Sequence, residues 1–177
     1  MQIIIAPEAF QKKDNQIGIF LAGGITNCSE WQNEVIKCLN DMSKYVEDGL
    51  EKLVIFNPRR KNFPIDDPNA AEEQITWEFN FLEKCDIFSI YFDYTEKSDQ
   101  PICFYELGRN LVKMEIKFPE DFKERIVISY KENFKRAKDV IIQSNLALNI
   151  KENYMVKQPA EHALKIIEAY RYLLKKK

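Results

Sequence analysis

The sequence has few of the residues from which metal centres and cofactor sites are built. It contains a single histidine, His162, and four cysteines, and no two of these cysteines form a Cys-X-X-Cys pair. A zinc site with cysteine and histidine ligands is therefore not expected. The Gly-X-Gly-X-X-Gly fingerprint of dinucleotide-binding folds is also absent. We expect the protein to use neither a metal ion nor a cofactor.

The chain also lacks an excess of charge and any long apolar run. Its net charge is −2 and its pI is about 5.6, so no basic field is present to attract nucleic acid. The N-terminal stretch MQIIIAPEAFQKK reaches Glu8 too early for a signal peptide, and no later run is long enough to span a bilayer. Cys85 and Cys103 lie in apolar segments, as reduced core cysteines do. We expect a cytoplasmic protein that binds neither nucleic acid nor membrane.

The length and composition are those of one globular domain. The 177 residues are 45% hydrophobic and 31% charged, which is enough apolar material for a single sizeable core. No internal repeat or low-complexity linker divides the sequence. We therefore expect one domain covering residues 1–177.

Short, continuously apolar runs indicate buried strands. The expected strands are residues 18–22, 53–56, 87–92 and 125–130, with a further short strand near 146–150. Apolar residues at helical spacing fill the intervals, and helices are expected to begin at Ser29, Asn69, Pro101 and Pro159, with another helical stretch near 134–143. Ser29 can cap a helix that runs to about Glu47, and Asn69 with Glu72 has the spacing of a capping box.

This alternation of strands and helices predicts the fold. Because the strands are apolar on both faces, helices must cover both sides of the sheet, which defines an α/β, doubly wound parallel sheet. In such sheets ligands bind beyond the carboxyl ends of the strands. The loops that matter are therefore residues 23–29, 57–68 and 93–106.

The first two of these loops could bind an anion. The first reads AGGITNCSEW, and its candidate ligand-binding residues are Gly23, Gly24, Thr26, Asn27 and Ser29. Glycine at a strand-to-helix turn is common, so this signal alone is weak. The second loop carries Arg59 and Arg60, which are either solvated surface charges or the partners of a phosphate or carboxylate. We expect a preference for monophosphates if one of these arginines binds the substrate.

Acidic residues are the candidates for chemistry. Glu78 lies between apolar positions of the second expected helix, Asp93 and Asp99 lie in the third loop, and Glu106 follows that loop. Glu106 stands among apolar residues just before Gly108. It is either a charge that stabilises a helix N-terminus or a desolvated nucleophile, and a carboxylate pair at this edge could divide nucleophilic and acid–base work at a sugar.

Four segments together resemble the nucleoside 2-deoxyribosyltransferase-like superfamily, which includes 2'-deoxynucleoside 5'-phosphate N-hydrolases. The segments are IFLAGGI, FNPRR, QITWEFNFLEKCDI and PICFYELGRN, and YELGR is the most specific of them. The resemblance covers roughly residues 17–112, with a weaker continuation to about residue 143. It implies a flavodoxin-like fold, a nucleoside or nucleotide as substrate, and assembly as a homodimer or larger homo-oligomer.

The resemblance also implies roles for individual residues. Glu106 would attack the anomeric carbon and form a covalent glycosyl-enzyme. Glu78 stands where the family often has an aspartate, so it would be the acid–base residue. Phe20 replaces a tyrosine of the transferases, and Asp139 stands where an asparagine or serine of a neighbouring subunit is usual. Independently of the resemblance, we expect Asp93, Asp99, Tyr105 and Gly108 to contribute to the substrate site.

Three functions remain open at this point. The first is cleavage or transfer of an N-glycosidic bond in a nucleoside or nucleoside 5'-monophosphate. The second is a non-catalytic nucleotide-binding or sensing module, which the departures at Phe20 and Glu78 favour and the intact YELGR segment opposes. The third is a nucleosidase that acts on a dinucleotide.

Overall fold

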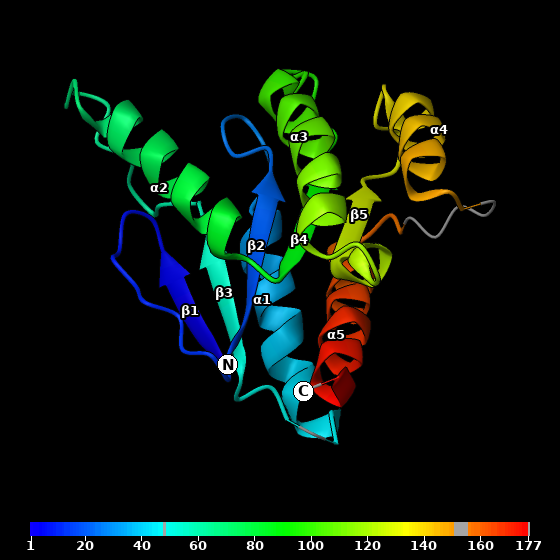
Figure 1. Ribbon diagram of the computed structural model, residues 1–177. Coiled ribbons are helices and arrows are strands. Elements are labelled where there is room, and N and C mark those ends of the chain that lie inside the picture. The colour runs from blue at the N-terminus through cyan, green and yellow to red at the C-terminus, as the bar shows by residue number, and fades with distance from the viewer. Residues whose placement is uncertain (48, 151–155, 177) are drawn as a thin grey trace.

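The computed structural model describes residues 1–47, 49–150 and 156–176. Its centre is a five-stranded sheet in which every neighbouring pair of strands is parallel (Figure 1). The strands are β1 (Gln2–Ile5), β2 (Ile17–Gly23), β3 (Leu53–Asn57), β4 (Ile87–Phe92) and β5 (Ile126–Tyr130), and their order across the sheet is β1-β3-β2-β4-β5. The order β3-β2-β4-β5 matches the first four strands of a flavodoxin-like sheet, and β1 extends the β3 edge.

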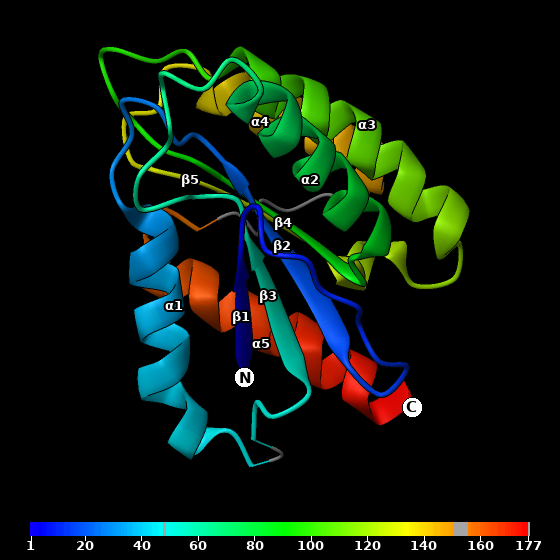
Figure 2. The same ribbon diagram turned by 90° about the vertical axis from the view of Figure 1, so that its left-hand side faces the viewer.

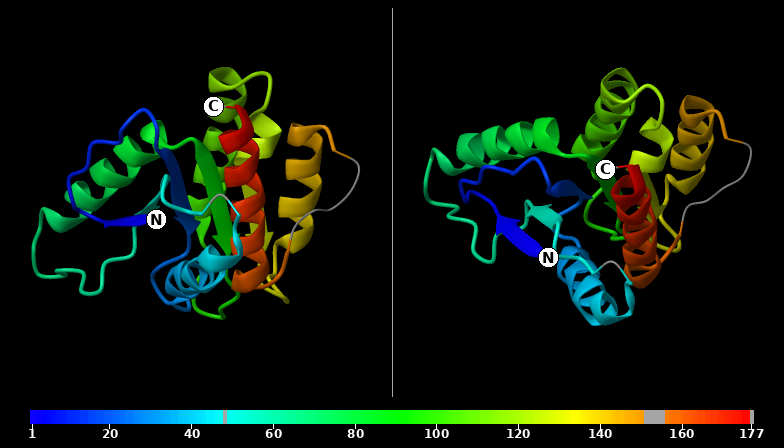
Figure 3. Two further views of the ribbon diagram at one scale, coloured as in Figure 1. Left: turned by 90° about the horizontal axis from the view of Figure 1, so that it is seen from below. Right: turned by 60° about the horizontal axis from the view of Figure 1, so that its bottom comes forward.

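Helices cover both faces of this sheet. They are α1 (Trp31–Met42), α2 (Ala70–Lys84), α3 (Pro101–Lys117), α4 (Ala137–Leu148) and α5 (Pro159–Lys176), with short 3₁₀ turns at Ser43–Tyr45 and Phe122–Arg125. Helices α2, α3 and α4 lie on one face, and α1 and α5 lie on the other (Figure 2). Seen from below, α1 and α5 run beside each other under the sheet (Figure 3). The predicted α/β, doubly wound architecture is thus confirmed.

One sequence prediction about an element was wrong, and one strand was missed. The expected strand near residues 146–150 is largely the end of α4, because Val140, Ser144 and Leu148 recur every four residues on a buried helix face. The strand β1 was not anticipated, since it has only four residues; it pairs with β3 from Gln2 opposite Val54 to the end of the strand.

The predicted helix caps also differ from the structure. Helix α1 begins at Trp31 and ends at Met42, before the expected Glu47, and the residue before it makes no side-chain capping bond. Ser29 does not cap it; its backbone N–H donates to Asp93 Oδ2 at 2.6 Å instead. Asn69 precedes α2 as expected but makes no side-chain capping bond either, so no capping box forms.

The side chains of β2 separate the two cores. Ile17, Ile19 and Leu21 are buried against α1 and α5, whereas Phe20 and Ala22 are buried on the face of α2 and α3. The face covered by α2 and α3 is rich in aromatic rings. Its ring contacts include Phe20–Trp77, Trp77–Phe81 and Phe81–Phe56. Among the described residues, no helix combines the length and apolarity needed to span a bilayer.

Candidate active site

A cavity of about 220 Å³ opens at the carboxyl end of β2, between α2 and α3. We call it the β2 cavity. The chain leaves β2 for β3 on one side and β4 lies on the other, so the cavity occupies the point where the strand order reverses. Its walls come from four places in the chain: Phe20, Ala22, Gly23, Gly24, Ile25 and Thr26 from β2 and its loop; Pro58 after β3; Glu78 of α2; and Ser98, Gln100, Pro101, Ile102, Cys103 and Glu106.

Larger hollows exist elsewhere, and acidic residues line them too. One of about 530 Å³ lies between β5, α4 and α5, with Lys123, Glu124, Lys165 and Glu168 among its mainly apolar walls. Lys165 there pairs with Glu168 at 2.7 Å in the manner of solvated surface charges. Size therefore does not identify the site. The smaller β2 cavity is distinguished by two acids, Glu78 and Glu106, whose pKa burial raises.

Glu106 lies in the second turn of α3, which begins at Pro101. This position excludes the simple interpretation of Glu106 as a charge on the first turn of a helix. The side chain is half-buried, and burial raises its pKa to about 8. The negative charge of Glu78 adds to this increase, and the positive charge of Arg109 opposes it. Glu106 is thus a poorly solvated carboxyl group at the wall of a cavity.

Glu78 reaches the same cavity from α2. It is half-buried, and burial raises its pKa above the ordinary glutamate range. A hydrogen bond from Gln74 Nε2 to Glu78 Oε1, 2.7 Å long, and the charge of Arg60 both oppose this increase. Two carboxyl groups with raised pKa therefore share one cavity. Such a pair can hold one proton near neutral pH, which supplies an acid and a carboxylate side by side.

The loop between β2 and α1 is shaped by its glycines. Gly23 has φ of 142°, and a Cβ there would overlap the carbonyl oxygen of Tyr91 and the ring of Trp31. A Cβ at Gly24 would overlap Cys28 Sγ and the side chain of Gln100. Glycine at these two positions lets the backbone of the loop lie close to these neighbouring groups. This close approach places Gly24 in the wall of the β2 cavity.

Arg59 fixes the loop between β2 and α1 through hydrogen bonds. Its guanidinium donates to Gln32 Oε1 at 2.8 Å, Glu30 Oε1 at 2.7 Å and the carbonyl oxygen of Ser29 at 2.6 Å, and more weakly to the carbonyl of Ile25. The side chain is largely buried. Arg59 therefore serves to fix the β2–α1 loop, and it does not line the cavity.

Arg60 is also occupied by protein partners. Its Nε donates to Gln74 Oε1 at 2.7 Å, and Nη2 forms an ion pair of 2.8 Å with Glu73. Neither arginine lines the β2 cavity, and no lysine, arginine or histidine is found among the described residues that do. The sequence predicts for these arginines either solvated surface charge or a bound phosphate or carboxylate, and it does not indicate these contacts with protein groups.

Asp93 connects two of the functional loops. It is buried, accepts the Ser29 N–H and pairs with Lys131 at 3.1 Å. Gln100 fixes the same loop, because its side-chain amide donates to the Asp93 carbonyl and accepts from the Asp93 N–H. Gln100 adopts a positive φ of 50° just before Pro101. This arrangement sets the start of α3 and hence the position of Glu106 in its second turn.

The structure brings some of the predicted site residues together and leaves others outside. The β2 cavity includes Phe20, Gly23, Gly24, Thr26, Glu78 and Glu106. It does not include Asn27, Ser29, Arg59, Arg60, Asp93, Asp99, Tyr105, Gly108 or Asp139. Asp99 and Tyr105 are exposed, and a Cβ at Gly108 would meet open space.

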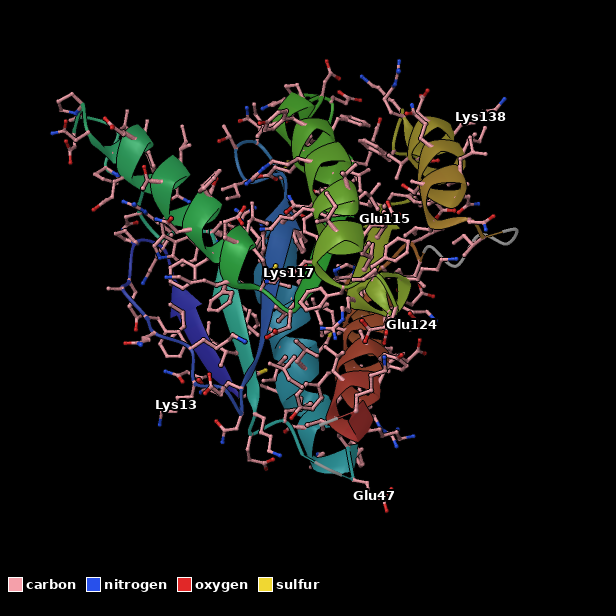
Figure 4. All side chains as sticks on the ribbon, viewed as in Figure 1. Lys13, Glu47, Glu115, Lys117, Glu124 and Lys138 are labelled. Atoms are coloured by element: carbon pink, nitrogen blue, oxygen red, sulfur yellow. The ribbon has the colours of Figure 1, made fainter. Side chains whose placement is uncertain are left out.

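Asp139 is remote from the acids within this chain. It lies in the first turn of α4 and pairs with Arg136 at 2.9 Å. Helix α4 stands on the other side of α3 from α2 (Figure 1), and the adjacent Lys138 extends outward from it (Figure 4). Lining residues that the sequence reasoning missed, such as Pro58 and Ser98, carry no local signal of their own.

Fold and site define a flavodoxin-like α/β protein with a carboxylate pair at the switch point of its sheet. The model of a family described as nucleoside 2-deoxyribosyltransferase-like matches residues 16–117, more than half of the 177-residue chain, and the protein belongs to this family. The match runs from the start of β2 to the end of α3 and so contains every residue of the β2 cavity. Members of the family are generally enzymes that transfer or hydrolyse glycosyl groups of nucleosides. No curated protein matches the chain.

Proposed function

We propose that the protein is an enzyme that cleaves or transfers the N-glycosidic bond of a deoxynucleoside. The observation that carries this proposal is the meeting of Glu78 and Glu106 in one cavity, each with a raised pKa. Perturbed carboxyl pairs in a cleft are the usual mark of acid–base and nucleophilic chemistry. Membership of the family supports the nucleoside as substrate.

The proposed reaction has two steps. A Glu106 carboxylate oxygen forms a bond to the anomeric carbon, while the carbon–nitrogen bond breaks and Glu78 delivers its proton to the leaving base. In the second step water or another base attacks the anomeric carbon and the bond to Glu106 breaks. Glu78 takes up the proton that the attacking group releases. The nature of this second nucleophile distinguishes a hydrolase from a transferase.

The cavity favours an unphosphorylated nucleoside over a monophosphate. Its charged walls are the two carboxyl groups, which repel a phosphate, and Arg59 and Arg60 are engaged elsewhere. A volume of about 220 Å³ is also below the usual range of roughly 300–1,000 Å³ for drug-sized ligands, which favours one nucleoside over a dinucleotide.

A substrate panel tests the proposed function. The protein is incubated with deoxynucleosides, ribonucleosides and their 5'-monophosphates, and the released base is measured with and without a second free base. We expect base release from a deoxynucleoside and a lower kcat/KM for its monophosphate. Release of base from none of these compounds, with binding retained, would instead indicate the sensing module.

We further propose that the protein assembles as a homo-oligomer. Ile102, Tyr105, Val112 and Ile116 form a stripe on α3 at spacings of three, seven and four residues, and each is more than half exposed. Ile75 and Phe79 of α2 are exposed as well. Exposed apolar side chains gathered on one helix face often mark an interface. Light scattering coupled to size exclusion should give a mass above the 20.9 kDa of one chain, and Val112→Lys should lower it.

A further inference from the structure

Gln74 lies behind the wall of the β2 cavity and contacts two of its lining residues. It is a largely buried residue of α2, one helical turn before Glu78. Its Nε2 donates to Glu78 Oε1 at 2.7 Å and to the carbonyl oxygen of Pro58 at 2.7 Å. Its Oε1 accepts from Arg60 Nε at 2.7 Å. The amide thus joins α2, the end of β3 and the base of the cavity.

The chemistry of the partners fixes the orientation of this amide. Arg60 Nε is only a donor, so the oxygen of Gln74 must face it. The carbonyl of Pro58 is only an acceptor, so the NH₂ group must face in that direction. One N–H of the NH₂ group is then left for Glu78, and it is directed at the carboxyl group that the proposed mechanism uses as acid and base. A rotation of the amide by 180° would break all three hydrogen bonds.

We propose that Gln74 is a positioning residue, which orients the carboxyl group of Glu78 and stabilises its charged form, and that Arg60 anchors Gln74 in this role. The catalytic consequence rests on the proposed function, and the contact itself does not. A donor aimed at a carboxylate favours the ionised form, and the charge of Arg60 behind the amide acts in the same direction.

The groups that face Glu78 come from three elements. Gln74 lies on its own helix, Arg60 follows β3, and Glu106 and Cys103 lie on α3. With Glu78 kept ionised, its charge helps to hold the proton of the pair on Glu106 in the free protein. The first step of the proposed reaction needs this proton on Glu78, whereas the second step needs Glu78 as a carboxylate base, which is the form that the N–H of Gln74 stabilises. The orientation that Gln74 gives to the carboxyl group serves both steps.

Gln74→Met removes the hydrogen bonds while retaining the length of the side chain. We expect the acid limb of the kcat/KM profile to move to higher pH by about one unit, because a hydrogen bond to a charged group is lost. We also expect kcat to fall roughly tenfold to a hundredfold with KM little changed, since the carboxyl group loses its orientation. Gln74→Glu retains the acceptor for Arg60 but has no donor for Glu78, and it should move the acid limb at least as far.

Thr76→Ala is the matched control. Thr76 is an exposed residue of α2, two positions from both Gln74 and Glu78, and its replacement should leave the pH profile and kcat unchanged. An equal shift in this control would show that the effect arises from general perturbation of the helix and would overturn the proposal.

Carbon-13 NMR titration of labelled glutamate carboxyl groups gives a readout without substrate, with Glu78→Gln used for assignment. The titration of Glu78 should move to higher pH in Gln74→Met and in Gln74→Glu. Unchanged titration of Glu78 in both variants would overturn the inference, whether or not the protein has the proposed activity. Conversely, an inactive wild-type protein would refute the proposed function, while the NMR shift would still decide the role of Gln74.

Discussion

The two faces of the sheet each contain a polar cluster, and the clusters differ in how well their groups are satisfied. Between the sheet and α5, His162 lies fully buried between Ser89 of β4 and Ser129 of β5, with both oxygen-to-nitrogen distances at 2.6 Å. On the opposite face, Glu78 and Glu106 share a cavity, and the charge of Glu78 disfavours ionisation of Glu106. The histidine cluster has no opening, whereas the acids face a cavity.

The comparison separates a structural polar group from the pair that we propose to be reactive. Burial lowers the pKa of His162 to about 3, so its imidazole stays neutral, with one ring nitrogen donating and the other accepting. The rings of Trp31 and Tyr91 pack edge-on against it and close the site. A buried group whose hydrogen bonds are all made stabilises the fold but cannot reach a ligand. A pair of poorly solvated carboxyl groups, in contrast, stabilises positive charge that develops nearby.

The contrast between the histidine cluster and the acid pair would be contradicted most strongly if the Glu106→Gln protein were active. The replacement is nearly isosteric and removes the nucleophile, so we expect turnover to fall by about three powers of ten or more. Steady-state kinetics with the best substrate of the panel provide the measurement. Activity within about tenfold of the wild type, equal to roughly 1.4 kcal/mol, would contradict the assignment.

Glu78→Ala should have the second largest effect. General acid–base catalysis typically contributes 10²–10⁴-fold, and it is expressed in the transition state, so kcat should fall by about that factor while KM changes little. The pH profile should lose one of its two limbs. A rise in KM alone would make Glu78 a substrate-binding residue, and the two faces would then differ less than we argue.

His162→Ala should affect stability more than activity. It leaves a cavity and removes the partner of two buried hydroxyl groups, so we expect a loss of roughly 3 kcal/mol or more in the free energy of unfolding. Denaturant unfolding gives this value. The exposed Arg171 on the same helix is the control, and Arg171→Ala should stay within about 0.5 kcal/mol of the wild type.

The two clusters should also give stability opposite dependences on pH. His162 has a folded pKa below the unfolded value of about 6.5, so the unfolded chain binds more protons, and stability falls as pH drops from about 6.5 towards 3. Glu106 has a folded pKa above the unfolded value of about 4.3, so its contribution is lost as pH rises from about 4.3 to 8.

The free energy of unfolding, measured as a function of pH for the wild type and for Glu106→Gln, tests this contrast. Relative to the wild type, Glu106→Gln should gain stability as pH rises towards 8. If the difference between the two proteins were the same at every pH, the carboxyl group of Glu106 would not be desolvated, and the contrast between the two faces would lose its physical basis.

The sequence predicted most of the architecture because the relevant signals are local. The strands β2 to β5 are continuously apolar, and Pro101 and Pro159 mark the starts of α3 and α5. The apolar residues after Gln143 are ambiguous, because a short run fits both a strand and a helix. Only the burial of Ser144 and Leu148 on one helix face decides between them.

The site was predictable only where a motif carries it. Glu106 and Glu78 stood out through the YELGR segment and the helix that precedes β4, and both line the cavity. Glu78 lies only four positions from Gln74, one helical turn away. The other partners of the Gln74 side chain and those of the Arg59 side chain lie between 14 and 35 positions away, and no sequence pattern reveals such partners. Loop geometry, rather than residue type, decides whether an arginine binds the protein or a ligand.

The most direct test of the central claim is to trap the glycosyl-enzyme. The protein is mixed with its substrate in the absence of an acceptor base, quenched in acid, digested and analysed by mass spectrometry. Our account predicts a deoxyribosyl adduct on the peptide that contains Glu106, and no adduct in Glu106→Gln. Turnover with an adduct on another residue, or in a Glu106→Gln protein, would contradict the claim that Glu106 is the nucleophile.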